Sequence, residues 1–143
     1  MTPSEDYVFE SWTGATVNDP TSSETKATIS GNLNLKANFK EKLYSIAISI
    51  ETKDFIGQTL DQPSLGGTVL APSLVKPNQA NTFSAIASEG YSFLKWESAE
   101  GALLSTSTNA NLSFSDSASV KAIFQQKSYD IEIEVTPSGA GYL

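Results

Sequence analysis

The sequence contains no cysteine and no histidine, and each absence excludes a class of chemistry. Without cysteine there is no disulfide framework, no thiolate metal site and no cysteine nucleophile. Without histidine, the chain lacks the commonest general base and the commonest transition-metal ligand. Arginine is missing too, because the nine basic residues are all scattered lysines, and with sixteen acidic residues the net charge is −7. We expect no binding of nucleic acid, which requires clustered Lys and Arg.

Long apolar runs are also absent. The apolar stretches are far shorter than the roughly 18 residues that cross a bilayer, so no membrane insertion is expected. The first residues have no apolar core of a signal peptide, and we expect Met1 to be a start placed inside a longer protein. The composition, 39% hydrophobic and 17% charged, is typical of a polar-surfaced β protein and not of a disordered chain.

The chain does contain an internal repeat. Segment 6–12 carries Tyr, Phe and Trp at its second, fourth and seventh positions, and segment 90–96 repeats them at an offset of 84 residues. Further on, 33–50 matches 118–135 at an offset of 85, and five of the nine positions of 36–44 are identical in 121–129. A repeat of this period indicates tandem modules of one fold.

The repeat divides the chain into three parts. We predict that residues 1–42 are the C-terminal half of a first repeat, 43–127 a complete second repeat and 128–143 the start of a third, so that the chain is a slice of a longer tandem array. Segment 136–142 matches the region that ends at 66–69. The second repeat therefore carries an insertion of about a dozen residues from Lys53 to Ser64, predicted to form a loop or a small extra turn.

Apolar and polar residues alternate along most of the chain, as they do in half-buried strands. Strands are predicted at 28–30, 33–39, 44–50, 67–71, 81–88, 91–97, 112–114, 118–124 and 131–135. The turn-forming residues at 30–32 and 115–117 predict a hairpin at the same place in both repeats. The fold class that follows is all-β and antiparallel, most simply a two-layer β-sandwich, with a β-grasp-like arrangement as the alternative.

The repeated aromatic residues predict a local irregularity. Tyr91 and Phe93 share one strand face, whereas Trp96 is three residues beyond Phe93 and falls on the other face of a regular strand. We favour a β-bulge that turns all three rings into one core, over burial on two sides of the sheet. Rings at matched repeat positions are usually core anchors, and a carbohydrate-stacking platform is the competing interpretation.

The ordered motifs resemble a known family. Segments 90–96, 120–124 and 129–141 together resemble the divergent internalin-B-type B-repeat, which also occurs among the Listeria–Bacteroides repeats. The resemblance implies a small all-β module strung in tandem along bacterial secreted or cell-surface proteins, as a stalk or spacer. It implies no catalytic residues. Asp6 stands where the first motif has Gly, and the insertion after Thr52 lengthens the first hairpin.

Few residues offer chemistry. No serine-hydrolase motif occurs, and we predict no catalytic residues, although the pair Glu97 and Glu100 leaves carboxylate-only hydrolysis open. No cofactor is expected. Calcium is a weak alternative through five scattered residues, none of them in a recognised calcium loop: Asn18, Asp19, Asp54, Asp61 and Asp116. In the insertion, Phe55 and Leu60 are the candidate ligand contacts.

Three functions are compatible with these features. The first is a non-catalytic structural or adhesion repeat, outside the cell or at its surface, whose partners are the neighbouring repeats. The second is a module that binds a glycan or a surface protein through exposed aromatic residues or through Phe55 and Leu60. The third is an accessory domain of an exported enzyme.

The two ends of the chain pose a packing problem, because each holds strands whose repeat partners are elsewhere. Both ends can pack onto the complete copy, or the C-terminal strand of one molecule can complete the N-terminal half of another. The first arrangement is favoured, since donation between molecules carries an association cost.

Overall fold

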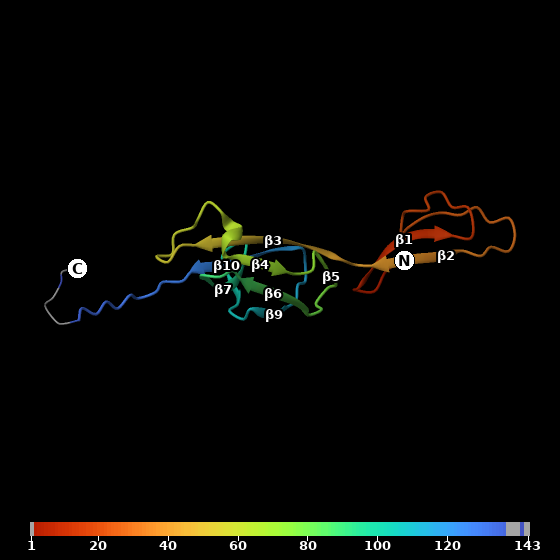
Figure 1. The fold of residues 1–143 in the computed structure, drawn as a ribbon. Coiled ribbons are helices and arrows are strands. Elements are labelled where there is room, and N and C mark those ends of the chain that lie inside the picture. Colours follow the sequence, from red (N-terminus) through yellow and green to blue (C-terminus); the bar gives the residue numbers. More distant parts are fainter. Residues whose placement is uncertain (1, 137–140, 142–143) are drawn as a thin grey trace.

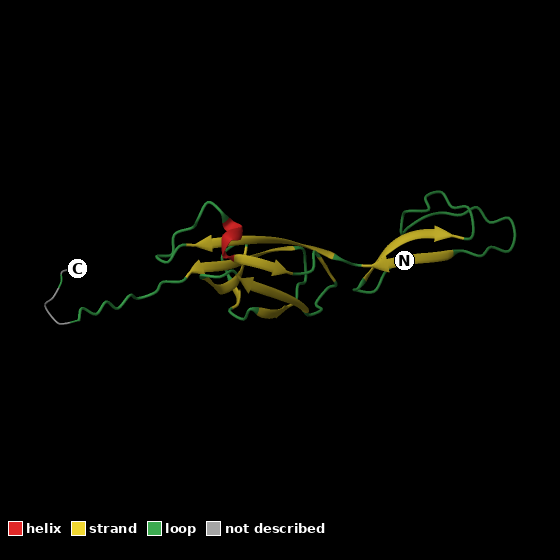
Figure 2. Ribbon diagram, viewed as in Figure 1, coloured by secondary structure: helices red, strands yellow, loops and turns green. Residues whose placement is uncertain are grey.

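Strands dominate the computed structural model, which describes residues 2–136 and 141 (Figures 1 and 2). The described residues contain no α-helix, and no helix that could span a membrane. The prediction of an all-β fold is confirmed. The elements in chain order are β1 Tyr7–Thr13, β2 Lys36–Glu41, β3 Tyr44–Lys53, the 3₁₀ helix η1 Pro63–Gly66, β4 Gly67–Leu70, β5 Leu74–Val75, β6 Asn81–Ala87, β7 Tyr91–Ser98, β8 Leu103–Ser105, β9 Asn109–Leu112 and β10 Ala118–Gln126.

Strands β3 to β10 form a two-layer sandwich. The larger sheet has the order β5-β3-β10-β7-β8 and the smaller sheet the order β4-β6-β9. Alternate residues of both sheets face inward, because side chains of a strand point to opposite faces in turn. The buried core drawn from the two layers consists of Ile46, Val75, Phe83, Ala85, Trp96, Ala110, Leu112, Val120, Ala122 and Phe124.

The centre of the larger sheet is a parallel pair, which differs from the antiparallel expectation. β10 runs parallel to β3, with Val120 opposite Ile48 and Ala122 opposite Ile50, and antiparallel to β7 on its other side. A parallel pair needs a long crossover connection, and here the strands of the smaller sheet supply it. Pairing of the first and last strands is also a feature of the β-grasp alternative, but two packed sheets make the sandwich the better description.

The predicted hairpin around 115–117 is wrong. β9, before this turn, pairs with β6 in the smaller sheet, whereas β10, after it, lies in the larger sheet. The turn therefore carries the chain from one layer to the other. Residues 28–30 form no strand either. Turn chemistry identifies where a chain bends, but it does not select the partner of the strand that follows.

The insertion forms the loop and small turn that its position predicts. The Asp54 carboxylate accepts backbone hydrogen bonds from Ile56 and Gln58, at 3.0 and 2.8 Å, which fixes a tight turn. The loop ends in η1, which packs against β3 and β10. Here Gly66 and Gly67 pass so close to Phe124 that neither has space for a Cβ atom.

The first part of the chain is a separate two-stranded sheet, in which β1 pairs antiparallel with β2. It lies at one end of the molecule, and residues 127–136 extend from the other end of the sandwich (Figure 1). The favoured packing of both ends onto the complete copy is not found, since β1 and β2 pair only with each other and residues 127–136 form no strand. The expected match of 136–142 to 66–69 lies largely outside the described residues.

Candidate functional site

The aromatic anchor of the sandwich is Trp96, whose side chain has no exposed surface. Its ring centroid lies 5.3 Å from that of Phe93 and 5.9 Å from that of Phe83, and its Nε1 donates to the Ser107 carbonyl at 3.0 Å. A bulge at Leu94 brings Phe93 and Trp96 onto one face. The predicted bulge and the core role of this ring are confirmed, whereas Tyr91 stays outside the core cluster.

The N-terminal hairpin repeats this geometry. Its bulge is at Glu10, and its rings Phe9 and Trp12 are again 5.3 Å apart. Phe9 and Phe39 are 5.9 Å apart, against 5.6 Å for Phe93 and Phe124 in the sandwich. Trp12 Nε1 donates to the Ser22 carbonyl at 2.9 Å, as Trp96 does to Ser107. The β1–β2 and β7–β10 strand pairs thus share antiparallel pairing, a bulge, ring contacts and an indole hydrogen bond.

The two strand pairs differ in how deeply their side chains are buried. No residue of 2–42 is buried, whereas Phe124 and Val120 have no exposed surface. Their counterparts at an offset of 85, Phe39 and Leu35, are 38% and 39% exposed. The difference arises because β10 has β3 on one side, β7 on the other and a second sheet above it, while β2 has only β1.

The edge of β2 that faces away from β1 is therefore open, and we call it the β2 edge. β2 is also shorter than β10, because it has no strand on this side. β10 begins at Ala118, whereas β2 begins at Lys36, the counterpart of Lys121. In the sandwich Ala118 and Ser119 pair only with β3, so this end of the strand exists because β3 is there. An open strand edge is a template for an added strand.

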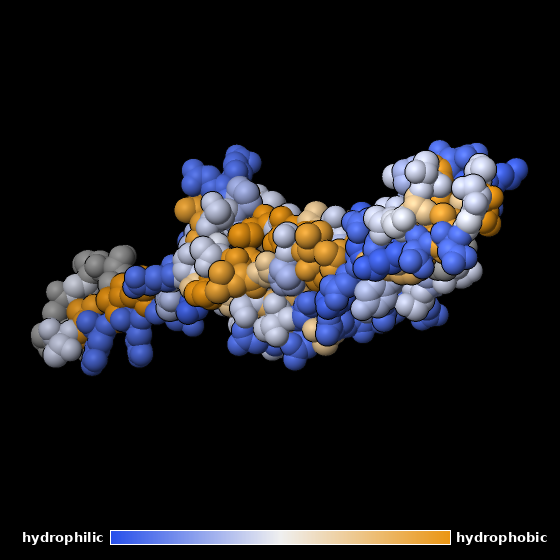
Figure 3. All heavy atoms as spheres, turned by 90° about the vertical axis from the view of Figure 1, so that its right-hand side faces the viewer, coloured by the Kyte–Doolittle hydropathy of each residue, from blue (hydrophilic) through white to orange (hydrophobic). Residues whose placement is uncertain are grey.

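At the opposite end of the molecule, residues 127–136 form an extended segment without strand partners, which we call the tail. Tyr129, Ile131 and Ile133 are 73%, 84% and 59% exposed. Figure 3 shows apolar surface along this segment next to the grey terminal residues, with hydrophilic side chains projecting from it. The predicted strand at 131–135 is thus not formed, because a strand needs a neighbour to satisfy its backbone.

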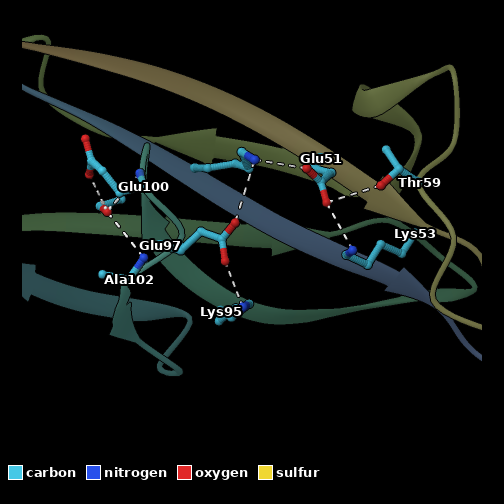
Figure 4. A network of polar contacts seen from close by, with 9 residues as sticks. Glu51, Lys53, Thr59, Lys95, Glu97, Glu100 and Ala102 are labelled. Carbon is cyan, nitrogen blue, oxygen red and sulfur yellow. Dashed lines mark hydrogen bonds and ion pairs between the residues drawn. The ribbon is translucent and has the colours of Figure 1, made fainter.

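A line of five alternating charges crosses the outer face of the larger sheet (Figure 4). Lys121 on β10 lies at the centre, 3.0 Å from Glu51 on β3 and 3.7 Å from Glu97 on β7. At one end Lys53 lies 3.2 Å from Glu51, and at the other Lys95 lies 2.7 Å from Glu97. Burial alone would raise the pKa of Glu51, but hydrogen bonds from Lys121 and Lys53 outweigh it and lower the pKa below 4.5. We call this set the ion network. Sequence reasoning missed it, because it depends on the parallel pairing of β3 with β10.

The two carboxylates considered for hydrolysis, Glu97 and Glu100, lie in different local surroundings. Glu97 belongs to the ion network, and both its oxygens contact lysines. Glu100 lies in the β7–β8 turn, where Ser98 Oγ donates to its Oε2 at 2.7 Å. Among the described residues, no three acidic, histidine or cysteine side chains gather in a metal-binding group. Two of the calcium candidates, Asp19 and Asp54, accept hydrogen bonds within turns.

The two candidate ligand contacts lie on the insertion in different surroundings. Phe55 is 59% exposed at the turn, beside Ile56 at 65%. Leu60 is half-buried, and its backbone N–H bonds the Thr52 carbonyl at 2.8 Å. The structure therefore exposes Phe55 and Ile56 together at the turn and ties the Leu60 backbone to β3.

A cleft of about 330 Å³ marks the junction between hairpin and sandwich. Lys76 bridges it to Glu41, with Nζ and Oε1 2.7 Å apart, and this hydrogen bond raises the pKa of Lys76. Both side chains are about half exposed, so the pair orients the junction weakly. The lining comprises Asp6, Tyr7, Glu41, Lys42, Lys76, Pro77, Asn78 and Gln79.

Comparison with known families agrees with this geometry. A family model described as the divergent InlB B-repeat domain matches residues 1–43 and 61–128. The chain belongs to the divergent InlB B-repeat family. No curated protein and no solved structure matches the chain.

Both matched segments of the divergent InlB B-repeat end just beyond corresponding strands, β2 and β10. The resemblance drawn from the motifs is therefore confirmed. Residues 44–60 lie between the two matches and hold all of β3 together with the first part of the insertion. Each matched segment thus contains one bulged aromatic strand pair, β1–β2 or β7–β10, and β3 lies between the two segments.

Proposed function

We propose that this chain is a non-catalytic spacer in which successive InlB B-repeats are joined in line, and that it acts outside the cell or at the cell surface. The observation that carries the proposal is the link between units. Only Lys42 and Leu43 separate β2 from β3, and the two strands run on in the same direction (Figure 1). Lys127 and Ser128 are the matching link after β10. Family membership supports this role, since such modules are strung along bacterial surface proteins.

An in-line link gives the array a defined length. β3 and its two-residue link add up to twelve residues, which at about 3.3 Å per residue correspond to roughly 40 Å per repeat. A spacer must keep its ends apart, and here the hairpin and the tail lie at opposite ends of the molecule (Figure 1). The parallel β3–β10 pair makes this possible, because the chain enters and leaves each sandwich in the same direction.

Small-angle X-ray scattering tests the spacer function. A derivative in which residues 43–127 are duplicated should have a maximum dimension about 40 Å greater than that of the chain itself, with an unchanged cross-section. The matched control carries the duplicate behind a flexible Gly/Ser linker of about 20 residues, and its scattering should show variable inter-domain positions. A duplicated chain that is no longer than the original would contradict the proposal.

A second function rests on the exposed pair Phe55 and Ile56. Two adjacent apolar side chains on a turn are suited to contact a glycan ring or a partner protein. We propose binding through this turn as the alternative, with the rest of the chain as its support. Phe55→Ala should abolish capture on a glycan array or in a pull-down, while Leu74→Ala, at a comparably exposed leucine on β5, should not. Equal capture by both variants rejects this function.

A further inference from the structure

β2 corresponds in sequence to β10, and the tail corresponds to β3, and within the sandwich β10 and β3 pair with each other. The tail residues Tyr129, Ile131, Ile133 and Val135 stand 85 positions after Tyr44, Ile46, Ile48 and Ile50 of β3. β2 stands 85 positions before β10. The chain therefore contains a formed example of the contact, the β3–β10 pair, and unpaired copies of both its halves.

The formed pair supplies the register. Ala118, Val120 and Ala122 lie opposite Ile46, Ile48 and Ile50. Residues 33–37 stand 85 positions before 118–122 of β10, and residues 131–135 stand 85 positions after 46–50 of β3. The same register therefore places Leu33 opposite Ile131, Leu35 opposite Ile133 and Ala37 opposite Val135. All six residues are apolar, and they fall on the face that is buried in the sandwich. The tail would cover the exposed surfaces of Leu33 and Leu35, which are 40% and 39% accessible.

Charge supports the same register. Lys121 lies opposite Ser49, so Lys36 would lie opposite Glu134. In the described residues no carboxylate forms an ion pair with Lys36, and Thr13, its neighbour on β1, is uncharged. The tail alternates its apolar residues with Asp130, Glu132 and Glu134. An acidic tail therefore meets a lysine on the outer face while its apolar side chains face inward.

The two surfaces lie at opposite ends of the molecule, so the tail of one copy meets the edge of another copy (Figure 1). Such a contact joins two different surfaces and does not close on itself. We propose that residues 129–135 of one copy of this chain add as a parallel strand to the β2 edge of a second copy, and that the contact repeats head to tail. It buries one short strand, so it is weak, with a dissociation constant of roughly 10 µM to 1 mM.

Sedimentation velocity over about 10 µM to 1 mM tests the proposal. The weight-average mass of the chain should rise with concentration. Ile133→Lys should remain monomeric over the same range, because it places a charge opposite Leu35 and weakens the contact by at least about tenfold. Ile86→Lys is the matched control, since Ile86 is 54% exposed on β6, against 59% for Ile133, and should associate as the unaltered chain does.

A synthetic peptide of residues 128–136 identifies the docking site. Added in excess, it should slow amide hydrogen exchange at 33–37, because β2 then extends to the length of β10. The same peptide with Ile133→Lys should leave exchange unchanged. A chain that stays monomeric while its exchange is insensitive to the peptide overturns the proposal. Association that persists in Ile133→Lys also overturns it, because a different surface then makes the contact.

Charge exchange tests the register itself. Lys36→Glu and Glu134→Lys each place like charges opposite one another, and each variant should self-associate about fivefold more weakly. In an equimolar mixture every contact between unlike variants carries an opposite-charge pair, so the mixture should associate clearly more strongly than either variant alone. A mixture as weak as the separate variants would show that Lys36 and Glu134 are not neighbours.

Discussion

At the scale of single residues, Trp12 and Trp96 make the same local contacts and differ in what covers them. Both contact a phenylalanine at 5.3 Å and donate to a serine carbonyl. Trp96 also meets Phe83 of the second sheet and is fully buried, whereas Trp12 is half-buried. The contribution of each ring to stability therefore depends on the second sheet more than on the hairpin.

Alanine substitution measures this difference. Trp96→Ala should reduce the free energy of unfolding of the sandwich by about 3–5 kcal/mol, because it leaves a large cavity between the sheets. Trp12→Ala should change the same transition by less than about 1 kcal/mol. Denaturant melts followed by far-UV circular dichroism give both values, and Trp96 fluorescence reports the sandwich alone in the Trp12 variant. Equal losses would contradict the separation of the two units.

The ion network makes stability depend on pH. The folded pKa of Glu51 lies below its ordinary value of 4.5, so its stabilisation is present above this value and is lost as the pH falls through the folded pKa. Glu51→Gln should therefore be less stable than the original chain by about 0.5–1 kcal/mol at pH 7, and the difference should disappear at low pH. Urea melts at several pH values measure it. Glu89→Gln, at an exposed glutamate outside the network, is the control, and a difference that does not change with pH would contradict the assignment.

At the scale of elements, the sequence predicted the strands better than their partners. Alternation located most of the strands, and the Phe-x-x-Trp spacing located the bulge, because both depend on neighbouring residues. The parallel β3–β10 pair and the assignment of β9 to the second sheet depend on contacts far apart in sequence. The ion network could not be foreseen for the same reason, and Phe55 and Leu60 could be placed in the insertion but not separated into exposed and half-buried.

The junction of η1 and β4 tests the packing of these elements. A Cβ atom at Gly67 would collide with the Ile86 carbonyl and the Phe124 ring, which are fixed by both sheets. Gly67→Ala should therefore reduce the free energy of unfolding by about 1–3 kcal/mol or more, as overpacking does. Gly31→Ala has open space around it and is the control, expected to change stability by less than about 0.5 kcal/mol. A neutral Gly67→Ala would show that η1 does not pack closely on β10.

At the scale of the whole molecule, the repeat explains both the shape and the surfaces left open. β2 leads into β3 through Lys42 and Leu43, and β10 leads into residues 129–135 through Lys127 and Ser128. The sandwich therefore receives its first strand, β3, directly from the last strand of the unit before it.

The central claim is that hairpin and sandwich are held in line, and a distance between spin labels tests it most directly. The chain has no cysteine, so Asn34→Cys with Gln58→Cys accepts two labels at exposed sites. β2, the link and β3 span eighteen residues, so double electron–electron resonance should give one narrow distance of about 60 Å. A broad distribution centred at about 40 Å or less would show that the hairpin folds back or moves freely, and would contradict the account.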